Sequence, residues 1–468
     1  MYRTLLVLGM AACLTGCLQP RYSRSSLPVP PAWPQNAAAQ TSAPVAPQAT
    51  ETKWQEFFTD KDLQSVIELA LANNRDLRMA ALNVERVQAL YRIQRAEQYP
   101  NISASFSADD YRLPKTATVA GFSVPKAVTV EQYSVNLGAA SWELDLFGRV
   151  RSLKRQALEQ YLATEQARSA AQISLVAAVA NTYLTLAADR ENLRLAQATF
   201  DAQQSSYELI LRSRDAGIAS DLDLRQAQSQ VEAARVDIAR YTGQATLDEN
   251  ALNLLVGTPV APGLLPNELG SDRALKDLSA GLPSEVLLRR PDILMAEHQL
   301  KGAYANIGAA RAAFFPQITL TGGAGYMSSD LTDLFTGGSK TWNFAPQVVM
   351  PIFDAGSRRA NLKVAKVDRD FAIAGYDKAI QSAFREVSDS LTLRTRLMEQ
   401  QDAQQALVNS LDETYRLSDA RYKAGIDSYL SVLVAQRSLY GAQQGLVNLR
   451  MARQANLVTL YKVLGGGA

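Results

Sequence analysis

Apolar residues follow a helical spacing along most of the chain. Ile293, Leu300 and Ile307 recur every seven residues, with alanines between them. This spacing places the apolar residues on one face of a helix, and the small residues allow a neighbouring helix to approach closely. Two stretches of 68 residues, 149–216 and 357–424, contain no proline. Each predicts a helix of roughly 100 Å, at ~1.5 Å per residue.

The pattern changes from helical to alternating after two prolines, Pro100 and Pro316. Apolar and polar residues then alternate over segments of about ten residues, the length of a strand that crosses a bilayer as part of a barrel. Because proline ends a helix, each of these prolines marks a switch from helix to membrane strand. We expect β-hairpins at about 101–147 and 317–353. The alternating apolar positions are Ile102, Ala104, Phe106, Ala108, Tyr133, Val135, Leu137 and Ala139 in the first segment, and Ile318, Leu320, Gly322, Ala324, Phe344, Val348, Met350 and Ile352 in the second.

Four strands of this kind cannot close a barrel. An open sheet edge is not tolerated in lipid, so the chain is expected to oligomerise. Two chains would give eight strands and three would give twelve, and the pattern alone does not choose between them. The predicted fold class is a mixed α and β membrane protein with four transmembrane strands and long coiled-coil helical hairpins.

The two halves of the chain are copies of one another. At an offset of 216, "RAEQYPNISA" at 95–104 matches "RAAFFPQITL" at 311–320. Farther along the offset is 208, and Ala216-Gly217-Ile218 matches Ala424-Gly425-Ile426. Since the shift falls in the segment after each proline, that segment tolerates insertion. We therefore expect one repeat at 53–257, a linker at 258–282 and a second repeat at 283–468.

A glycine ends each long helix. The two segments read "DAGIASDLDL" around Gly217 and "KAGIDSYLSV" around Gly425. Glycine supplies a left-handed C-cap, and Asp or Ser shortly afterwards can cap the next helix. Helices of about 37 residues, as the spacing to Gly257 and Gly465 indicates, then run back along the first. Each repeat thus predicts a long helical hairpin with its turn at one end.

Composition excludes several functions. The net charge is +2, with 48 basic and 46 acidic residues, so no global field favours nucleic acid. One histidine and two cysteines leave little for His-based catalysis, disulfides or a metal centre. We expect no enzymatic activity, no catalytic residues and no cofactor. The uncharged stretch 169–188 is long enough for a membrane helix, but its repeat partner 377–396 is highly charged, which argues against that interpretation.

The N-terminus resembles a secreted lipoprotein. Residues 1–16 read as a signal peptide that ends in Leu14-Thr15-Gly16 before Cys17, as in a bacterial lipobox. Cys17 is the predicted lipidation site and mature N-terminus, with an ordinary signal peptide as the alternative. Residues 17–52 are rich in proline and predict an extended tether for the lipid anchor.

Several motifs resemble the outer-membrane efflux channel family of TolC-like proteins, especially its lipidated OprM-type members. They are "WELDLFGRVRS", "LRRPDILMAEH", "NIGAARAAFFP", "MPIFDAG" and "RYKAGIDSYL", and the likeness covers nearly the whole chain from Trp54. The resemblance implies a homotrimer in the outer membrane of a Gram-negative bacterium, with a twelve-stranded β-barrel continuous with a twelve-helix α-barrel in the periplasm. It also implies a passive exit duct for a tripartite multidrug pump.

The resemblance further implies partners. These are a periplasmic adaptor protein, an inner-membrane pump of the resistance-nodulation-division (RND) type, and outer-membrane lipid, with no nucleic acid. A channel for metal-ion efflux or for type I secretion is the alternative. The transported substrates cannot be read from the sequence.

The resemblance also implies a closed aperture near the two glycine turns. Asp223 is placed to pair with Arg421 or Tyr422, tying one hairpin to another. The family's acidic ring corresponds to Val434 here, so Leu430 and Val434 predict a hydrophobic constriction instead. Plain helix capping is the alternative role for Asp223. The turns themselves are the predicted adaptor docking sites, formed by Gly217, Ile218, Ala219 and Ser220 in the first repeat and by Gly425, Ile426, Asp427 and Ser428 in the second.

Overall fold

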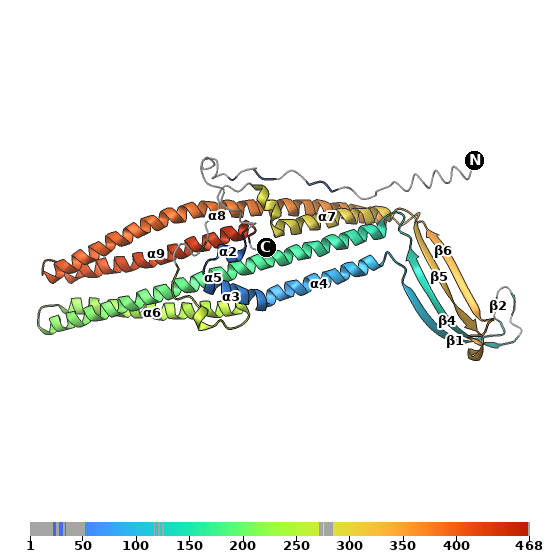
Figure 1. The fold of residues 1–468 in the computed structure, drawn as a ribbon, viewed down its shortest axis with the longest axis horizontal. Helices are drawn as coiled ribbons and strands as arrows, with labels where there is room; N and C mark the ends of the chain where they lie inside the picture. Colours follow the sequence, from blue (N-terminus) through green and yellow to red (C-terminus); the bar gives the residue numbers. More distant parts are fainter. Residues whose placement is uncertain are drawn as a thin grey trace. The chain divides into compact units, whose positions relative to one another are not determined.

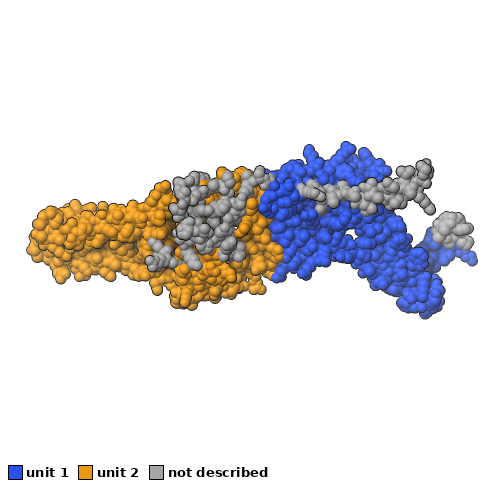
Figure 2. Space-filling view, turned by 45° about the horizontal axis from the view of Figure 1, so that its top comes forward, with its two compact units in different colours: residues 1–25, 85–164, 296–375 blue, residues 26–84, 165–295, 376–468 orange. Residues whose placement is uncertain are grey.

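The structure is a computed structural model of the chain. It describes residues 22–24, 28–30, 33, 52–116, 118–119, 122–123, 126–270, 275 and 284–466. Two compact units make up the chain, coloured separately in Figure 2. Unit 1 comprises residues 1–25, 85–164 and 296–375, and unit 2 comprises 26–84, 165–295 and 376–468. Each unit therefore draws on both sequence repeats.

Unit 1 contains a four-stranded antiparallel sheet. Its strands are β1 (Ile102–Leu113), β4 (Val128–Glu143), β5 (Gln317–Ser328) and β6 (Lys340–Val349), in the order β1-β4-β5-β6 (Figure 1). Two short strands, β2 (Thr118–Val119) and β3 (Phe122–Ser123), form a separate hairpin between β1 and β4. Each repeat supplies one hairpin of the main sheet, and the strands β4 and β5 join the two repeats.

The sheet has one apolar and one polar face. The register pairs Phe106 with Val135 and Leu137 with Ala324, so apolar residues of neighbouring strands share a face. The opposite face carries Ser107 and Ser134, whose hydroxyls are 2.8 Å apart. Phe106, Leu137, Trp342, Phe344 and Val348 are all exposed in the single chain. A sheet with this pattern suits a barrel wall between lipid and water.

Long helices continue from the strands. They are α4 (Arg75–Ala96), α5 (Arg149–Asp215), α7 (Pro291–Ala312) and α8 (Ser357–Lys423), each with residues in both units. Both α5 and α8 have 67 residues, close to the predicted length. In unit 2, α6 (Asp221–Val256) runs back along α5, and α9 (Tyr429–Val463) runs back along α8 (Figure 1).

The α5 segment that resembles a membrane helix packs inside the protein. By length and composition, α5 passes as a membrane span, and it alone does so among the described residues. However, 56% of its most apolar window is buried within the chain. Val176, Val179, Ala180 and Leu186 are buried core residues. The sequence argument against a membrane helix therefore agrees with the packing of this segment.

Short helices complete unit 2. These are α2 (Trp54–Phe57) and α3 (Lys61–Asn73), the latter capped by Asp60, and two 3-10 turns, η2 (Pro262–Leu264) and η4 (Ser284–Arg289), lie between α6 and α7. A third 3-10 turn, η5 (Leu331–Asp333), lies in the β5–β6 loop of unit 1. The Phe57 ring stacks on Tyr461 of α9, with centroids 4.2 Å apart. Gly257 ends α6 at φ +80°, and an added Cβ would lie 2.6 Å from the carbonyl oxygen of Asn73, so only glycine fits there.

The predicted tether is partly bound to the folded chain. In unit 1, Tyr22 and Arg24 hydrogen-bond to Glu297 on α7. In unit 2, the Trp33 ring stacks on Phe384 of α8, with centroids 4.6 Å apart. A wholly extended and unattached tether therefore does not describe these residues. The predicted signal peptide and Cys17 lie outside the described residues.

Candidate functional site

The first candidate region is the turn between α5 and α6. The amide of Ile218 donates to the Ser213 carbonyl (2.8 Å) and that of Gly217 to the Arg214 carbonyl (2.9 Å). These two bonds, with Gly217 at φ +75°, form a Schellman motif that satisfies the last carbonyls of α5. Ile218 is left 83% exposed. The predicted docking segment Gly217–Ser220 is thus a tight turn with an apolar side chain facing outward.

A capping box then starts α6. The Asp223 amide donates to Ser220 Oγ (3.1 Å), while the Ser220 amide donates to Asp223 Oδ2 (3.1 Å). The Ser220 hydroxyl also donates to Asp223 Oδ2 (2.7 Å). Reciprocal bonding of this kind satisfies two amides that the first turn of a helix otherwise leaves without partners.

The second turn repeats the backbone of the first. The amide of Ile426 donates to the Arg421 carbonyl (2.9 Å) and that of Gly425 to the Tyr422 carbonyl (2.8 Å), with Gly425 at φ +71°. Ile426 is 63% exposed. Ser428 occupies the N-cap of α9 but makes no side-chain capping bond within the described chain. Instead, Arg421 Nε and Nη2 donate to the two carboxylate oxygens of Asp427 (2.5 and 3.1 Å).

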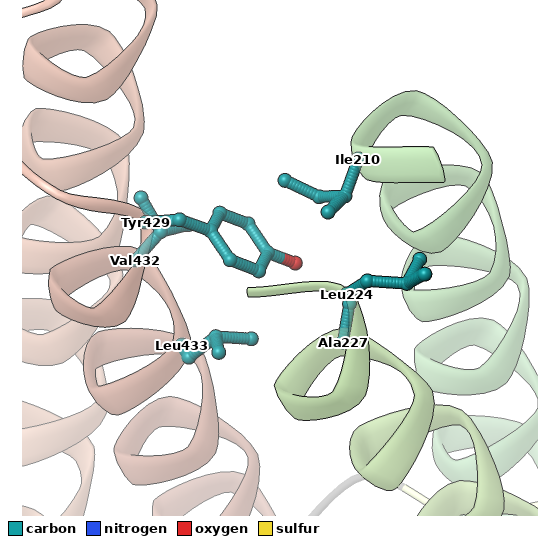
Figure 3. Close-up of a cluster of buried hydrophobic side chains, with 6 residues drawn as sticks. All are labelled: Ile210, Leu224, Ala227, Tyr429, Val432 and Leu433. Atoms are coloured by element: carbon teal, nitrogen blue, oxygen red, sulfur yellow. The ribbon is translucent and has the colours of Figure 1, made fainter. Parts of the chain in front are cut away.

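A buried cluster joins the two hairpins just behind their turns. Ile210, Leu224 and Ala227 come from the first hairpin, and Tyr429, Val432 and Leu433 from the second. Figure 3 shows the Tyr429 ring pointing from α9 toward Ile210 and Leu224. We call these six residues the tip cluster. It holds the two turns side by side within one chain.

The predicted tie between Asp223 and Arg421 does not form within the described chain. Asp223 is engaged by Ser220, and Arg421 by Asp427. A side chain three residues from an N-cap reaches its own helix end with little loss of freedom, whereas a bond to another hairpin must order two distant groups. Inside one chain, the capping role considered for Asp223 is the one the geometry favours.

Tyr422 nevertheless lies near Asp223. Burial raises the pKa of the Tyr422 hydroxyl, and the negative charge of Asp223 raises it further. The Tyr422 ring also packs against Tyr429 of the tip cluster, with centroids 5.3 Å apart. The structure therefore brings two of the three predicted tie residues together without a hydrogen bond between them.

The predicted constriction residues line a groove on the second hairpin. Leu430 and Val434 lie one turn apart on α9, both about half exposed. The groove has a volume of about 420 Å³ and is lined also by Leu411, Thr414 and Ser418 of α8. Two apolar side chains at this spacing present one continuous surface beside the turn.

Sequence reasoning missed the bonds that hold the hairpins together. The Tyr440 hydroxyl donates to Asp237 Oδ2 (3.0 Å), and Gln444 Nε2 donates to the Tyr241 hydroxyl (3.1 Å), both linking α9 to α6. It also missed the pairing of Arg421 with Asp427. Opposite charges on either side of a Schellman turn were the available signal for that pair.

Comparison with known proteins decides the family. The family model described as outer membrane efflux protein matches residues 66–258 and 282–466. The chain belongs to the outer membrane efflux protein family. It is 48% identical over 470 residues to the toluene efflux pump outer membrane protein TtgC of Pseudomonas putida, covering 100% of this chain and 96% of the relative. The antibiotic efflux pump outer membrane protein ArpC of the same species has the same identity and coverage.

Solved structures show the same fold. The open state of the Neisseria gonorrhoeae MtrE outer membrane channel matches with a TM-score of 0.85 and 37% identity, covering 96% of this chain and 98% of that one. The predicted resemblance, fold class, outer-membrane location and role as an efflux duct are confirmed. Membership of a channel family implies transport rather than catalysis.

Proposed function

We propose that this efflux protein works as a homotrimer. The observation that supports the proposal is the amphipathic sheet, which ends in the edge strands β1 and β6 within the described chain. Three copies of four strands give a closed barrel of twelve, in which β1 of one copy pairs with β6 of the next. The matching α-barrel would be built from four helices of each copy. These are α5 with α4 or α6 from the first repeat, and α8 with α7 or α9 from the second.

The trimer would serve as the exit duct of a tripartite pump. Its partners would be a periplasmic adaptor and an inner-membrane RND pump, with antibiotics or organic solvents as cargo. The relatives named for antibiotic and toluene efflux support this class of cargo. A lipid on Cys17 would anchor the chain, and no other covalent or bound cofactor is needed.

The adaptor would dock on the two turns. Ile218 and Ile426 are exposed on rigid Schellman turns, and the glycines beside them leave space, since an added Cβ would meet nothing within 4 Å. An apolar side chain on a rigid turn is a suitable anchor for a partner's shallow pocket. Ala219, Ser220, Asp427 and Ser428 complete the docking surface.

The aperture would lie at the same end. Leu430 and Val434 would narrow it with apolar side chains, and charged groups at the turns would hold neighbouring copies together. Asp223 or Asp427 of one copy would meet Arg421 or Tyr422 of the next when the duct is closed. The description of one relative as an open state supports a second, closed state in the family.

Single-channel recording in planar bilayers tests the duct and its gate. The wild type should conduct poorly, and Asp223→Ala combined with Arg421→Ala should raise the conductance. Ser220→Ala is the matched control, because it breaks the capping box and leaves both charges in place. If the double variant conducts like the wild type, or if the control conducts as well as the double variant, the proposed tie is wrong.

The alternative cargoes are separable by drug and metal sensitivity. A deletion strain should become sensitive to antibiotics and solvents, and Gly425→Trp should fail to restore resistance while still forming trimers. Sensitivity to metal salts alone would favour metal-ion efflux, and loss of a secreted protein would favour type I secretion. Intact mass of the mature protein tests lipidation, since an unmodified chain that starts elsewhere excludes Cys17.

A further inference from the structure

A buried carboxylate on α7 is held by the N-terminal segment. Glu297 is 3% exposed, and its Oε2 accepts from Arg24 Nη2 at 2.8 Å. Its Oε1 accepts from Arg24 Nε at 3.2 Å and from the Tyr22 hydroxyl at 2.9 Å. A two-pronged bond from arginine to carboxylate fixes orientation as well as distance.

Two further α7 residues enclose Tyr22. Lys301 Nζ lies 5.4 Å from the centre of the Tyr22 ring and 3.5 Å from Glu297 Oε1. The Tyr304 ring meets the Tyr22 ring edge to face, with centroids 5.8 Å apart. Burial alone would raise the pKa of Glu297, but the bonds from Arg24 and Tyr22 and the charge of Lys301 outweigh it, so the pKa is lowered.

The duplication shows that this arrangement is particular to α7. At the repeat offset of 216, Glu297 corresponds to Ala81, Lys301 to Glu85 and Tyr304 to Gln88. The first repeat therefore has no carboxylate at the central position and the opposite charge one turn later. A role shared by both repeats therefore does not explain Glu297, since the matching position in α4 is the uncharged Ala81.

We propose that Glu297, Lys301 and Tyr304 form a binding site for the N-terminal segment, which enters it with Tyr22 and Arg24. We call Tyr22, Arg24 and Trp33 the strap, because these residues of the N-terminal segment are attached to the folded chain. The stack of Trp33, which is 2% exposed, on Phe384 is a second attachment farther along the same segment. Phe384 has Val176 as its repeat partner, so this aromatic site also belongs to one repeat alone.

The strap sets how far the lipid anchor can move. Five residue steps separate Cys17 from Tyr22, which span at most about 17 Å, whereas an unattached chain from Cys17 to Trp54 would reach about 125 Å. A lipid on Cys17 would therefore be held close to α7. The site fixes the anchor at one level on each chain of the assembly.

Limited trypsin digestion of the full-length, membrane-embedded protein tests the strap. Trypsin cleaves after Arg21 and Arg24, and the side chain of Arg24 is hydrogen-bonded to Glu297. In Glu297→Gln, release of the segment should be about tenfold faster, as expected from the loss of a charge-assisted bond. Glu159→Gln is the matched control, because Glu159 is also buried and bonds His298, the neighbour of Glu297. It should leave the cleavage rate unchanged.

A cross-link provides a readout that does not depend on a variant of α7. A photoreactive phenylalanine analogue placed at position 22 should label a peptide within 291–312 in intact protein. Tyr22→Phe, which keeps the ring and removes the hydroxyl, should raise tryptic cleavage by a smaller factor than Glu297→Gln. Equal cleavage of wild type and Glu297→Gln, equal acceleration by Glu159→Gln, or labelling elsewhere would each overturn the proposal.

Discussion

The two hairpin tips, the α5–α6 turn and the α8–α9 turn, share one backbone conformation but are stabilised by different side-chain contacts. Both turns are Schellman motifs, with glycines at φ +75° and +71° and the same pair of amide bonds. At the first tip, Ser220 and Asp223 cap α6 within the helix start. At the second tip, the N-cap Ser428 makes no such bond in the described chain, and Arg421 reaches across the turn to Asp427 instead.

The difference shows what duplication preserves. Backbone geometry survives because glycine and the helix ends dictate it. The side chains diverge because each turn can be stabilised in more than one way. A capping box stabilises only its own helix start, whereas the arginine–aspartate pair joins two charged side chains whose partners can be exchanged for those of another chain. The second tip is therefore the better candidate for a contact that must break on opening.

The largest expected effect comes from the tip cluster, which both hairpins share. Leu433→Ala should lower local stability by about 2–4 kcal/mol, because it leaves a cavity between α9 and the first hairpin. Amide hydrogen exchange of both turns would measure it. Leu222→Ala is the control, since Leu222 is exposed, and should change exchange little. Faster exchange at the second turn alone would mean that the cluster does not couple the tips.

Replacing the turn glycines should affect the two tips equally. Gly217→Ala and Gly425→Ala each place a Cβ at positive φ in open space, so each should cost about 1–2 kcal/mol of backbone strain. Gly243→Ala, inside α6 with open space around it, should instead stabilise its helix. Chemical denaturation followed by exchange at each turn would measure these costs. Unequal costs would show that one turn is strained by something beyond its backbone.

Replacing the N-cap serines should affect the stability of the two tips differently. Ser220→Ala removes a bonded cap and should cost about 1 kcal/mol in the stability of the α6 start, while Ser428→Ala should cost close to nothing. Each serine is thus the control for the other, and hydrogen exchange in the first turn of α6 and of α9 is the measurement. A cost at Ser428 equal to that at Ser220 would contradict the difference described here.

Much of the fold follows from the sequence for physical reasons. Heptad spacing and the absence of proline give the long helices, and the alternation after Pro100 and Pro316 gives the strands. Gly217 and Gly425 mark the turns because a helix often ends at a residue that adopts the left-handed conformation without steric strain. These features are local, and each depends on a few neighbouring residues.

The side-chain partners were harder to predict. The sequence predicts a tie from Asp223 to Arg421 or Tyr422 of another hairpin, and within one chain Asp223 bonds Ser220, because a local partner is available at a lower entropic cost. The strap was missed for a different reason. Glu297 lies in a heptad helix, and nothing in its local spacing reveals that Arg24, 273 positions away, covers it. Only the mismatch with Ala81 in the other repeat distinguished it.

The smallest expected effect is a loss of stability at the second tip at low pH. The hydrogen bonds and charge of Arg421 lower the pKa of Asp427 below its ordinary value. The stabilisation from this pair is therefore present above the unfolded carboxyl pKa, near 4, and is lost as the pH falls through the lower folded value. Hydrogen exchange at the second turn, corrected for the intrinsic pH dependence, should become faster below about pH 4 relative to the first turn. Asp427→Asn should show the faster exchange already at pH 7 and little further change in acid, and salt should reproduce part of the effect because the pair is exposed. If the acceleration of exchange in acid persists unchanged in Asp427→Asn, another group causes it. The Arg421–Asp427 pair would then not be what stabilises the second tip.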